Sequence, residues 1–168
     1  MDIFCEYIVK RNRNGKDYAK IAGIIILAIL LSLIFIAFLG SLSFIFICGV
    51  CFGAYKLITF TDVEYEYIVT STVLDVDRIL ARSSRKRLLS INLTEIDACR
   101  PIEDMPEAGD RKITDATPNG IEDGVYGIDF SKNSVRTRLL FKPNPKVITN
   151  IKKASPSLVT VRPSDIEA

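Results

Sequence analysis

The chain has 168 residues, of which 48% are hydrophobic and 25% are charged, and its formal net charge is +2. It contains no histidine, which excludes a Ser-His-Asp triad, a Cys-His pair and any zinc or haem site that needs a histidine ligand. The four cysteines lack the dense, even spacing of a disulfide-rich secreted domain, so we expect a reducing, cytosol-facing compartment.

The positive charge is concentrated at the amino terminus. Residues 1–20 carry five basic and three acidic side chains, which leaves 17 of each sign in the rest of the chain. A nucleic-acid-binding domain would concentrate Lys and Arg on its folded part. The neutral remainder therefore predicts a protein without a nucleic-acid partner.

A long apolar run follows the amino terminus. No charged residue lies between Lys20 and Lys56, a stretch of 35 positions that a soluble domain of this size could not cover. A single straight helix of that length would measure about 52 Å, whereas the hydrocarbon core of a bilayer is about 30 Å thick. A cleaved signal peptide is excluded, because its apolar region would be only about 7–15 residues long. With Gly40-Ser41 as the breaker, we expect a two-helix transmembrane hairpin over residues 17–60, with helices of about 17–39 and 42–60.

The segment before the hairpin, residues 1–16, is a basic stub. Phe4, Tyr7, Ile8 and Arg11 fall at helical spacing, which predicts a short interfacial helix. Five Lys and Arg residues within the first 20 positions favour a cytoplasmic amino terminus. Because a hairpin returns the chain to the same side, we expect a multi-pass protein of the cell membrane with both termini cytoplasmic.

Two short motifs lie in the second apolar helix. Gly49 and Gly53 form a Gly-x-x-x-Gly pair, which allows close helix packing, either against the first helix or in self-association. Cys48 and Cys51 form a Cys-x-x-Cys, but a membrane helix offers no group that would ionise these thiols. We therefore expect the cysteines to serve packing, and neither redox chemistry nor metal binding.

Beyond residue 60 the hydrophobic period changes to two, which is typical of half-buried antiparallel strands. The expected strands are about 63–70, 74–77, 86–93, 96–101, 112–115, 126–130 and 136–141, with surface loops at 103–110 and 116–124. Asn144 as N-cap, Pro145 at the first helical position and the apolar stripe of Val147, Ile148 and Ile151 predict a closing helix. We expect an α+β membrane protein in which residues 61–155 form a small antiparallel β-barrel or sheet domain, plugged by this helix and followed by a flexible tail, residues 156–168.

The densest basic cluster, the basic turn, consists of Arg82, Arg85, Lys86 and Arg87. Two interpretations remain open: the cluster contacts anionic lipid headgroups, or it is a solvated turn without a ligand. The paired carboxylates Asp75 and Asp77 share one strand face and are expected to be solvated, whereas Glu64 and Glu66 are expected to oppose basic residues across the sheet.

The order of these motifs resembles the bacterial pleckstrin-homology-like domains. The residues that carry the resemblance are 65–70, 74–79, the turn 82–87 with 88–91, and the closing segment 139–145 before a helix. With its Phe4-x-Glu6-Tyr7 start and short hairpin, the whole chain is similar to a family of small membrane proteins from Gram-positive, clostridial-type bacteria. The resemblance implies a PH-like fold and a membrane setting, and it implies no activity and no catalytic residues.

The expected function is that of a membrane-anchored cytoplasmic binding or scaffold module that is not an enzyme and has no catalytic residues, cofactor or metal site. Its expected partners are the lipid bilayer, anionic headgroups, and an unknown protein or a second copy of the chain. The alternative is an accessory subunit of a larger membrane complex such as a transporter, with Gly49 and Gly53 as the docking face.

Overall fold

The computed structural model describes residues 4–132 and 134–166 of the chain. The chain divides into two compact units, which are described separately below. The first unit combines the residues up to Arg11 with Glu64–Ile79 and the chain from Arg85 onward, and the second comprises Asn12–Val63 and Leu80–Ser84. The apolar run is therefore an insertion within the sequence of the first unit.

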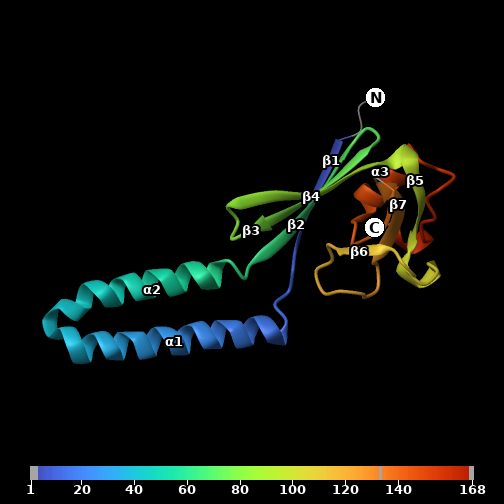
Figure 1. Cartoon of the computed structure of the whole chain (residues 1–168). Helices are drawn as coiled ribbons and strands as arrows, with labels where there is room; N and C mark the ends of the chain where they lie inside the picture. Colours follow the sequence, from blue (N-terminus) through green and yellow to red (C-terminus); the bar gives the residue numbers. More distant parts are fainter. Residues whose placement is uncertain (1–3, 133, 167–168) are drawn as a thin grey trace. The chain divides into compact units, whose positions relative to one another are not determined.

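The apolar run is helical from Gly15 to Thr59, and this is the one segment of the described chain that is long and apolar enough to cross a membrane. It consists of α1 (Gly15–Leu39), a 3-10 turn (Gly40–Leu42) and α2 (Ser43–Thr59). The two helices lie side by side and antiparallel (Figure 1), with the rings of Phe35 and Phe46 stacked 5.0 Å apart between centroids. The structure thus has one continuous helical segment that bends back on itself at the 3-10 turn, in place of two separate membrane helices.

Local sequence explains where this segment begins, bends and ends. The backbone N–H of Asn14 donates to the Asp17 carboxylate over 3.1 Å, which caps the start of α1. The chain reverses at Gly40, whose φ of 55° is a left-handed conformation that favours glycine. At the other end, Arg13 and Asp62 form a 2.8 Å ion pair that joins the two ends of the segment.

The first sheet contains the amino-terminal stub. Its strand order is β1-β2-β3-β4. The strands are β1 (Phe4–Lys10), β2 (Val63–Thr70), β3 (Val73–Leu80) and β4 (Ser84–Asn92). β1 runs antiparallel to β2, with Phe4 opposite Thr70 and Lys10 opposite Glu64.

The predicted interfacial helix in the stub is therefore wrong. Phe4, Tyr7 and Ile8 fall at helical spacing, but the segment is also rich in aromatic and β-branched residues, which are favoured in strands. The open edge of β2 offers hydrogen-bonding partners to this run, and alternate side chains of β1 become half-buried. The partner strand, and not local spacing, decides the structure here.

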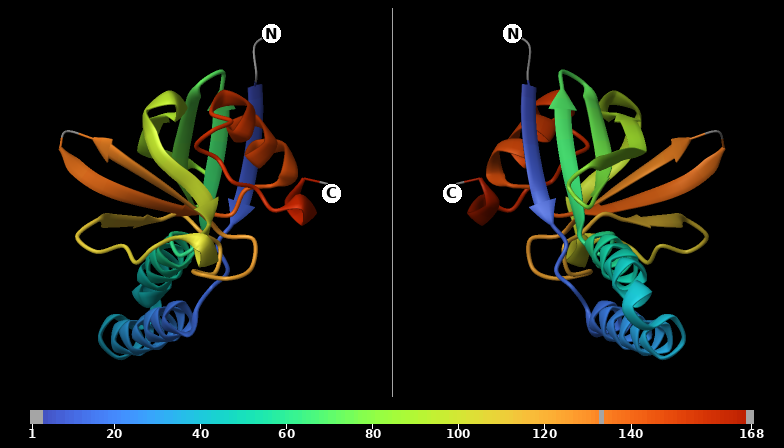
Figure 2. Two further views of the ribbon diagram at one scale, coloured as in Figure 1. Left: turned by 90° about the vertical axis from the view of Figure 1, so that its right-hand side faces the viewer. Right: turned by 90° about the vertical axis from the view of Figure 1, so that its left-hand side faces the viewer.

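The second sheet has the order β5-β7-β8-β6. Its strands are β5 (Ile96–Pro101), β6 (Lys112–Asp115), β7 (Tyr126–Lys132) and β8 (Val135–Phe141). In Figure 2 its strands run in a clearly different direction from those of the first sheet. Short 3-10 turns occupy Leu93–Glu95, Ile102–Asp104 and Pro163–Asp165.

The strand positions predicted from the alternating pattern are confirmed within a few residues, and of the predicted barrel or sheet the structure has the sheet form, with no closed barrel among the described residues. The described residues form two separate four-stranded sheets that do not close. β6 runs parallel to β8, with Asp115 opposite Leu140, so the second sheet is not purely antiparallel. The pairing differs because the chain crosses through a loop from β6 to β7 before β8 forms, and the period of a strand does not specify its partner.

Tyr67 of β2 joins the two sheets at the centre of the core. Its ring meets the edge of Phe141 of β8 with 5.6 Å between centroids, and both side chains are buried. Its hydroxyl donates to the carbonyl of Ala116 over 2.6 Å and accepts from the backbone N–H of Lys142 over 3.3 Å. The phenol is thus fully hydrogen-bonded inside an apolar core, as a buried hydroxyl requires.

The predicted closing helix is confirmed as α3 (Pro145–Ala154). The Asn144 side chain accepts from the backbone N–H of Val147 over 2.8 Å, which caps the helix start. Val147, Ile148 and Ile151 form its buried face.

The carboxyl-terminal segment is not a flexible tail over the described residues 156–166. Val159 and Val161 are buried. The backbone N–H of Cys99 in β5 donates to the carbonyl of Leu158 over 2.8 Å, and the carbonyl of Cys99 accepts from the backbone N–H of Thr160 over 2.9 Å. The Tyr126 hydroxyl donates to the Asp165 carboxylate. The alternating apolar residues of this segment extend the second sheet by a parallel bridge to β5.

A buried ion pair crosses the second sheet. Asp129 of β7 lies opposite Arg138 of β8, and the two join through hydrogen bonds of 2.7 and 2.8 Å. Arg138 also donates to the carbonyl of Pro106 over 2.6 Å, and Arg111 lies 3.3 Å from the Asp129 carboxylate. The network ties the loop between β5 and β6 to the sheet.

Candidate binding surfaces

The basic turn lies at the connection between β3 and β4. Arg82 occupies the turn with a φ of 54°, and Arg85, Lys86 and Arg87 begin β4. All four side chains are exposed.

Two arginines of the basic turn are paired with carboxylates of the same sheet. Arg85 lies 2.8 Å from the Glu66 carboxylate, and Arg87 lies 3.1 Å from Asp75 and 3.0 Å from Asp77. The expectation that Glu66 opposes a basic residue is confirmed, whereas the expectation of freely solvated carboxylates at Asp75 and Asp77 is wrong. Their negative charge reduces what Arg85 and Arg87 offer to an anionic ligand.

Glu66 is the most unusual carboxyl group of this surface. Its side chain is fully buried, and its Oε2 atom has no hydrogen-bond partner within the described residues. Burial raises the pKa of Glu66, the neighbouring Glu6 carboxyl raises it further, and the nearby Arg85 guanidinium opposes these effects. Glu6 comes from β1, so the sheet brings together two carboxyl groups that lie 60 positions apart in the sequence, a proximity that the sequence analysis missed.

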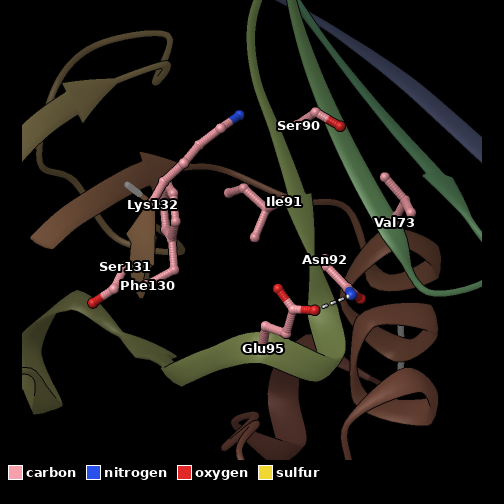
Figure 3. A pocket seen from close by; sticks show the side chains of 8 residues that line it. All are labelled: Val73, Ser90, Ile91, Asn92, Glu95, Phe130, Ser131 and Lys132. Atoms are coloured by element: carbon pink, nitrogen blue, oxygen red, sulfur yellow. Dashed lines mark hydrogen bonds between the residues drawn. The ribbon is translucent and has the colours of Figure 1, made fainter. Parts of the chain in front are cut away.

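A second surface feature is a pocket of about 240 Å³ lined by strands from both sheets (Figure 3). Its lining residues are Val73, Ser90, Ile91, Asn92, Glu95, Phe130, Ser131 and Lys132. Ile91 points toward Phe130 and Lys132, and Asn92 donates to the Glu95 carboxylate over 2.9 Å. Neither Ser90 nor Ser131 hydrogen bonds to a basic side chain in the part of the chain that the structure describes.

The small residues of α2 do not pack against α1. A Cβ atom added at Gly49 or Gly53 would meet nothing within 4 Å. Close packing within the helical segment therefore does not explain the Gly-x-x-x-Gly pair. Cys48 and Cys51 are free and exposed on the same helix.

The remaining cysteines, Cys5 and Cys99, lie in the two sheets. Cys99 is completely buried, and burial raises the pKa of its thiol to about 12, which suppresses the nucleophilic thiolate. Cys5 is a free thiol on β1. Among the described residues, no group of three or more acidic or cysteine side chains is arranged to hold a metal ion.

The model of one protein family, the bacterial PH-like domain family DUF6106, matches residues 1–161. The chain belongs to this family. Neither a curated protein nor a solved structure matches the chain. The match confirms the resemblance to bacterial PH-like domains, and it identifies neither a clostridial source nor a family of membrane proteins.

The matched range shows what a DUF6106 domain includes. It spans β1, the apolar helical segment and the chain up to Val161, so the insertion between β1 and β2 belongs to the domain. PH-like domains are generally non-catalytic binding modules for lipids or proteins. This DUF6106 chain has the corresponding architecture of two sheets and a carboxyl-terminal helix, together with an apolar segment that indicates membrane association.

Proposed function

We propose that the protein is a cytoplasmic binding or scaffold module without catalysis, anchored in the cell membrane by a helical segment that crosses the bilayer twice. Pairing of β1 with β2 carries this proposal. Lys10 and Glu64 are direct partners in one sheet, so the chain enters and leaves the helical segment at the same place. A single crossing would put β1 and β2 on opposite sides of the membrane and prevent their pairing.

Helix lengths support two crossings. The apolar part of α1, residues 21–39, extends about 28 Å, and the 17 residues of α2 extend about 25 Å, against a hydrocarbon core of about 30 Å. Basic residues gather at one end of the segment and are absent from the turn, which favours a cytoplasmic location for that end. The basic residues are Lys10, Arg11, Arg13, Lys16, Lys20 and Lys56.

Cysteine labelling in intact cells tests the topology. The background replaces Cys5, Cys48 and Cys51 and keeps the buried Cys99. A membrane-impermeant reagent should label Ser41→Cys at the helical turn in intact cells, and it should label Ser157→Cys only after lysis. Labelling of Ser157→Cys in intact cells contradicts the cytoplasmic domain, and no labelling of Ser41→Cys before lysis contradicts the complete double crossing.

We further propose that the basic turn makes a weak, diffuse contact with anionic lipid. All four side chains of the basic turn are exposed, so their positive ends can reach an anionic surface. Arg85 and Arg87 also contact carboxylates of the same sheet. Each basic side chain near an anionic surface is worth about 1 kcal/mol. The expected binding is therefore sensitive to salt and tolerant of the headgroup.

A soluble derivative makes this contact measurable. In the joined domain, residues 12–62 are replaced by Asn-Gly. It should co-sediment with phosphatidylglycerol vesicles at about 0.1 M salt and dissociate toward about 1 M, as the Debye length falls from about 10 to about 3 Å. Arg82→Ala with Lys86→Ala should abolish binding, and the charge-matched pair Lys112→Ala and Arg136→Ala should retain it. Absence of binding at low salt, or binding that survives high salt, contradicts a diffuse contact.

One observation favours the alternative, an accessory subunit of a larger membrane complex. Gly49 and Gly53 face open space, so a helix of another membrane protein can approach α2 closely there. Replacing both glycines by Ile should eliminate co-purification of a membrane partner if this docking occurs. A wild-type protein that purifies from mild detergent without a stoichiometric partner contradicts the subunit function.

A further inference from the structure

A groove runs along one side of the α1–α2 pair. Near the basic end its volume is about 410 Å³, and Lys20, Ile24, Leu57 and Phe60 are among the residues that line it. A second hollow of about 220 Å³ shares Ile24 and Leu57 and continues to Leu31. The two hollows form one apolar channel, which begins at a lysine.

Two glycines keep the channel open. Gly23 of α1 lines its basic end, and Gly53 of α2 lines its apolar end. A Cβ atom at either position would meet nothing within 4 Å, so the channel is open beside both glycines. In a bilayer such a channel is filled by an apolar chain, since an empty space loses its dispersion contacts.

The electrostatics of the basic end select an anion. Lys20 is exposed and lies at the mouth, and Lys16, one turn earlier on the same helix face, is also exposed. Asp62, the carboxylate near the end of α2, is neutralised by Arg13 at 2.8 Å. Thr61 also lines the mouth, but its hydroxyl donates to the carbonyl of Ile58, so the positive charge comes from lysine.

The length of the channel fits one leaflet. Lys20 and Leu31 are eleven residues apart on α1, which corresponds to about 16 Å along the helix. Half of the hydrocarbon core is about 15 Å thick. An acyl chain in the channel therefore reaches the middle of the bilayer while its headgroup stays at the lysine.

We propose that this channel binds one anionic glycerophospholipid, with an acyl chain between α1 and α2 and the phosphate on Lys20. The site differs from the basic turn in both residues and chemistry. It rests on the membrane insertion proposed above, because only an inserted segment meets lipid at this depth.

The test uses the full-length protein in mild detergent, equilibrated with equal amounts of phosphatidylcholine and phosphatidylglycerol. Mass spectrometry of the retained lipid should show enrichment of phosphatidylglycerol over the supplied mixture. Lys20→Gln should lower the enrichment about fivefold, the effect of losing one contact of about 1 kcal/mol. Gly53→Leu, which fills the channel, should lower the total retained lipid. Lys56→Gln is the matched control, because Lys56 lies over the Phe52 ring and outside the channel, and it should leave the enrichment unchanged.

Three outcomes overturn the proposal. An equal loss of phosphatidylglycerol enrichment in Lys20→Gln and Lys56→Gln would show that the basic residues attract anionic lipid without a specific site. Absence of enrichment in the wild type would leave the channel without a specific lipid. A wild-type dimer that Gly53→Leu disrupts would identify a helix of a second copy as the occupant. Carbonate extraction of the wild type and of each variant tests the proposed function separately. Release of the wild-type chain from membranes by carbonate would contradict membrane insertion, whereas the three outcomes above concern only the lipid site.

Discussion

The joined domain tests whether β1 belongs to the folded unit. Lys10 lies opposite Glu64, so the same register places Arg11 opposite Val63. Two residues then suffice to connect Arg11 to Val63, and Asn-Gly is favoured in two-residue hairpin turns. We expect the joined domain to be soluble and cooperatively folded, because the replaced residues belong to the helical unit.

The stability that β1 contributes can be worked from its burial. Cys5, Tyr7 and Val9 alternate as its half-buried side chains, and the Tyr7 ring lies 6.2 Å from that of Tyr67. Half-burial of a side chain contributes about 1 kcal/mol, so the three together contribute about 3 kcal/mol. We take the backbone hydrogen bonds to offset the entropy of ordering the strand. A fragment of residues 62–168, which lacks β1, should therefore melt about 10–15 °C below the joined domain.

Thermal unfolding followed by circular dichroism measures this difference. Within the joined domain, Tyr7→Ala should lower the free energy of unfolding by about 1 kcal/mol, because Tyr7 contacts the core. Ile8→Ala is the matched control, since Ile8 lies on the exposed face, and it should change stability by less than about 0.5 kcal/mol. Equal melting temperatures for the fragment and the joined domain would refute the assignment of β1 to the sheet.

Three further predictions concern the same domain. Arg138→Leu should cost about 3–5 kcal/mol in urea unfolding, because Asp129 stays buried without its main partner, and Asp129→Asn in the same chain should recover part of that loss. Gly127→Ala should cost about 1 kcal/mol or less, because its Cβ would meet the Met105 side chain, which is flexible and can shift, and a double-mutant cycle with Met105→Ala should trace the cost to this contact. The raised pKa of Glu66 makes the folded state hold a proton that the unfolded state has lost, so stability should fall as the pH rises above the ordinary glutamate value of 4.5. In Glu66→Gln the free energy of unfolding should depend less on pH in this range. The same pH dependence in the variant and the wild type would contradict the assignment to Glu66.

Local patterns predicted the strands of the domain well, for a physical reason. Tyr65, Tyr67 and Val69 alternate with polar or less buried positions because one face of β2 packs into the core, and that alternation is visible in any single strand. The cap at Asn144 and the stripe of α3 are likewise local. Elements whose signal lies within ten residues could therefore be placed from the sequence.

Features that depend on distant partners could not be placed. β1 finds its partner across the whole helical segment, and Val159 pairs with Cys99 across 60 positions. The spacing of hydrophobic residues within each strand does not indicate which distant strand it pairs with. The pairing of Asp129 with Arg138 was equally hidden, because it depends on the register of a hairpin and not on the presence of the two charges.

Whether a basic side chain is available to a ligand depends, like strand pairing, on residues far away in the sequence. The basic turn holds the densest cluster of Lys and Arg in the sequence, yet Arg85 and Arg87 are bound to carboxylates that the sheet brings from β2 and β3. Lys20 is a single cation in the sequence, but it lies where an apolar channel opens, and no ion pair of Lys20 is found within the described residues. An anionic headgroup binds more strongly to a cation that has no carboxylate partner. Burial of the lipid's acyl chain in the channel adds hydrophobic free energy to this binding. Anionic lipid should therefore be held more tightly at the lysines of α1 than at the arginines of β4.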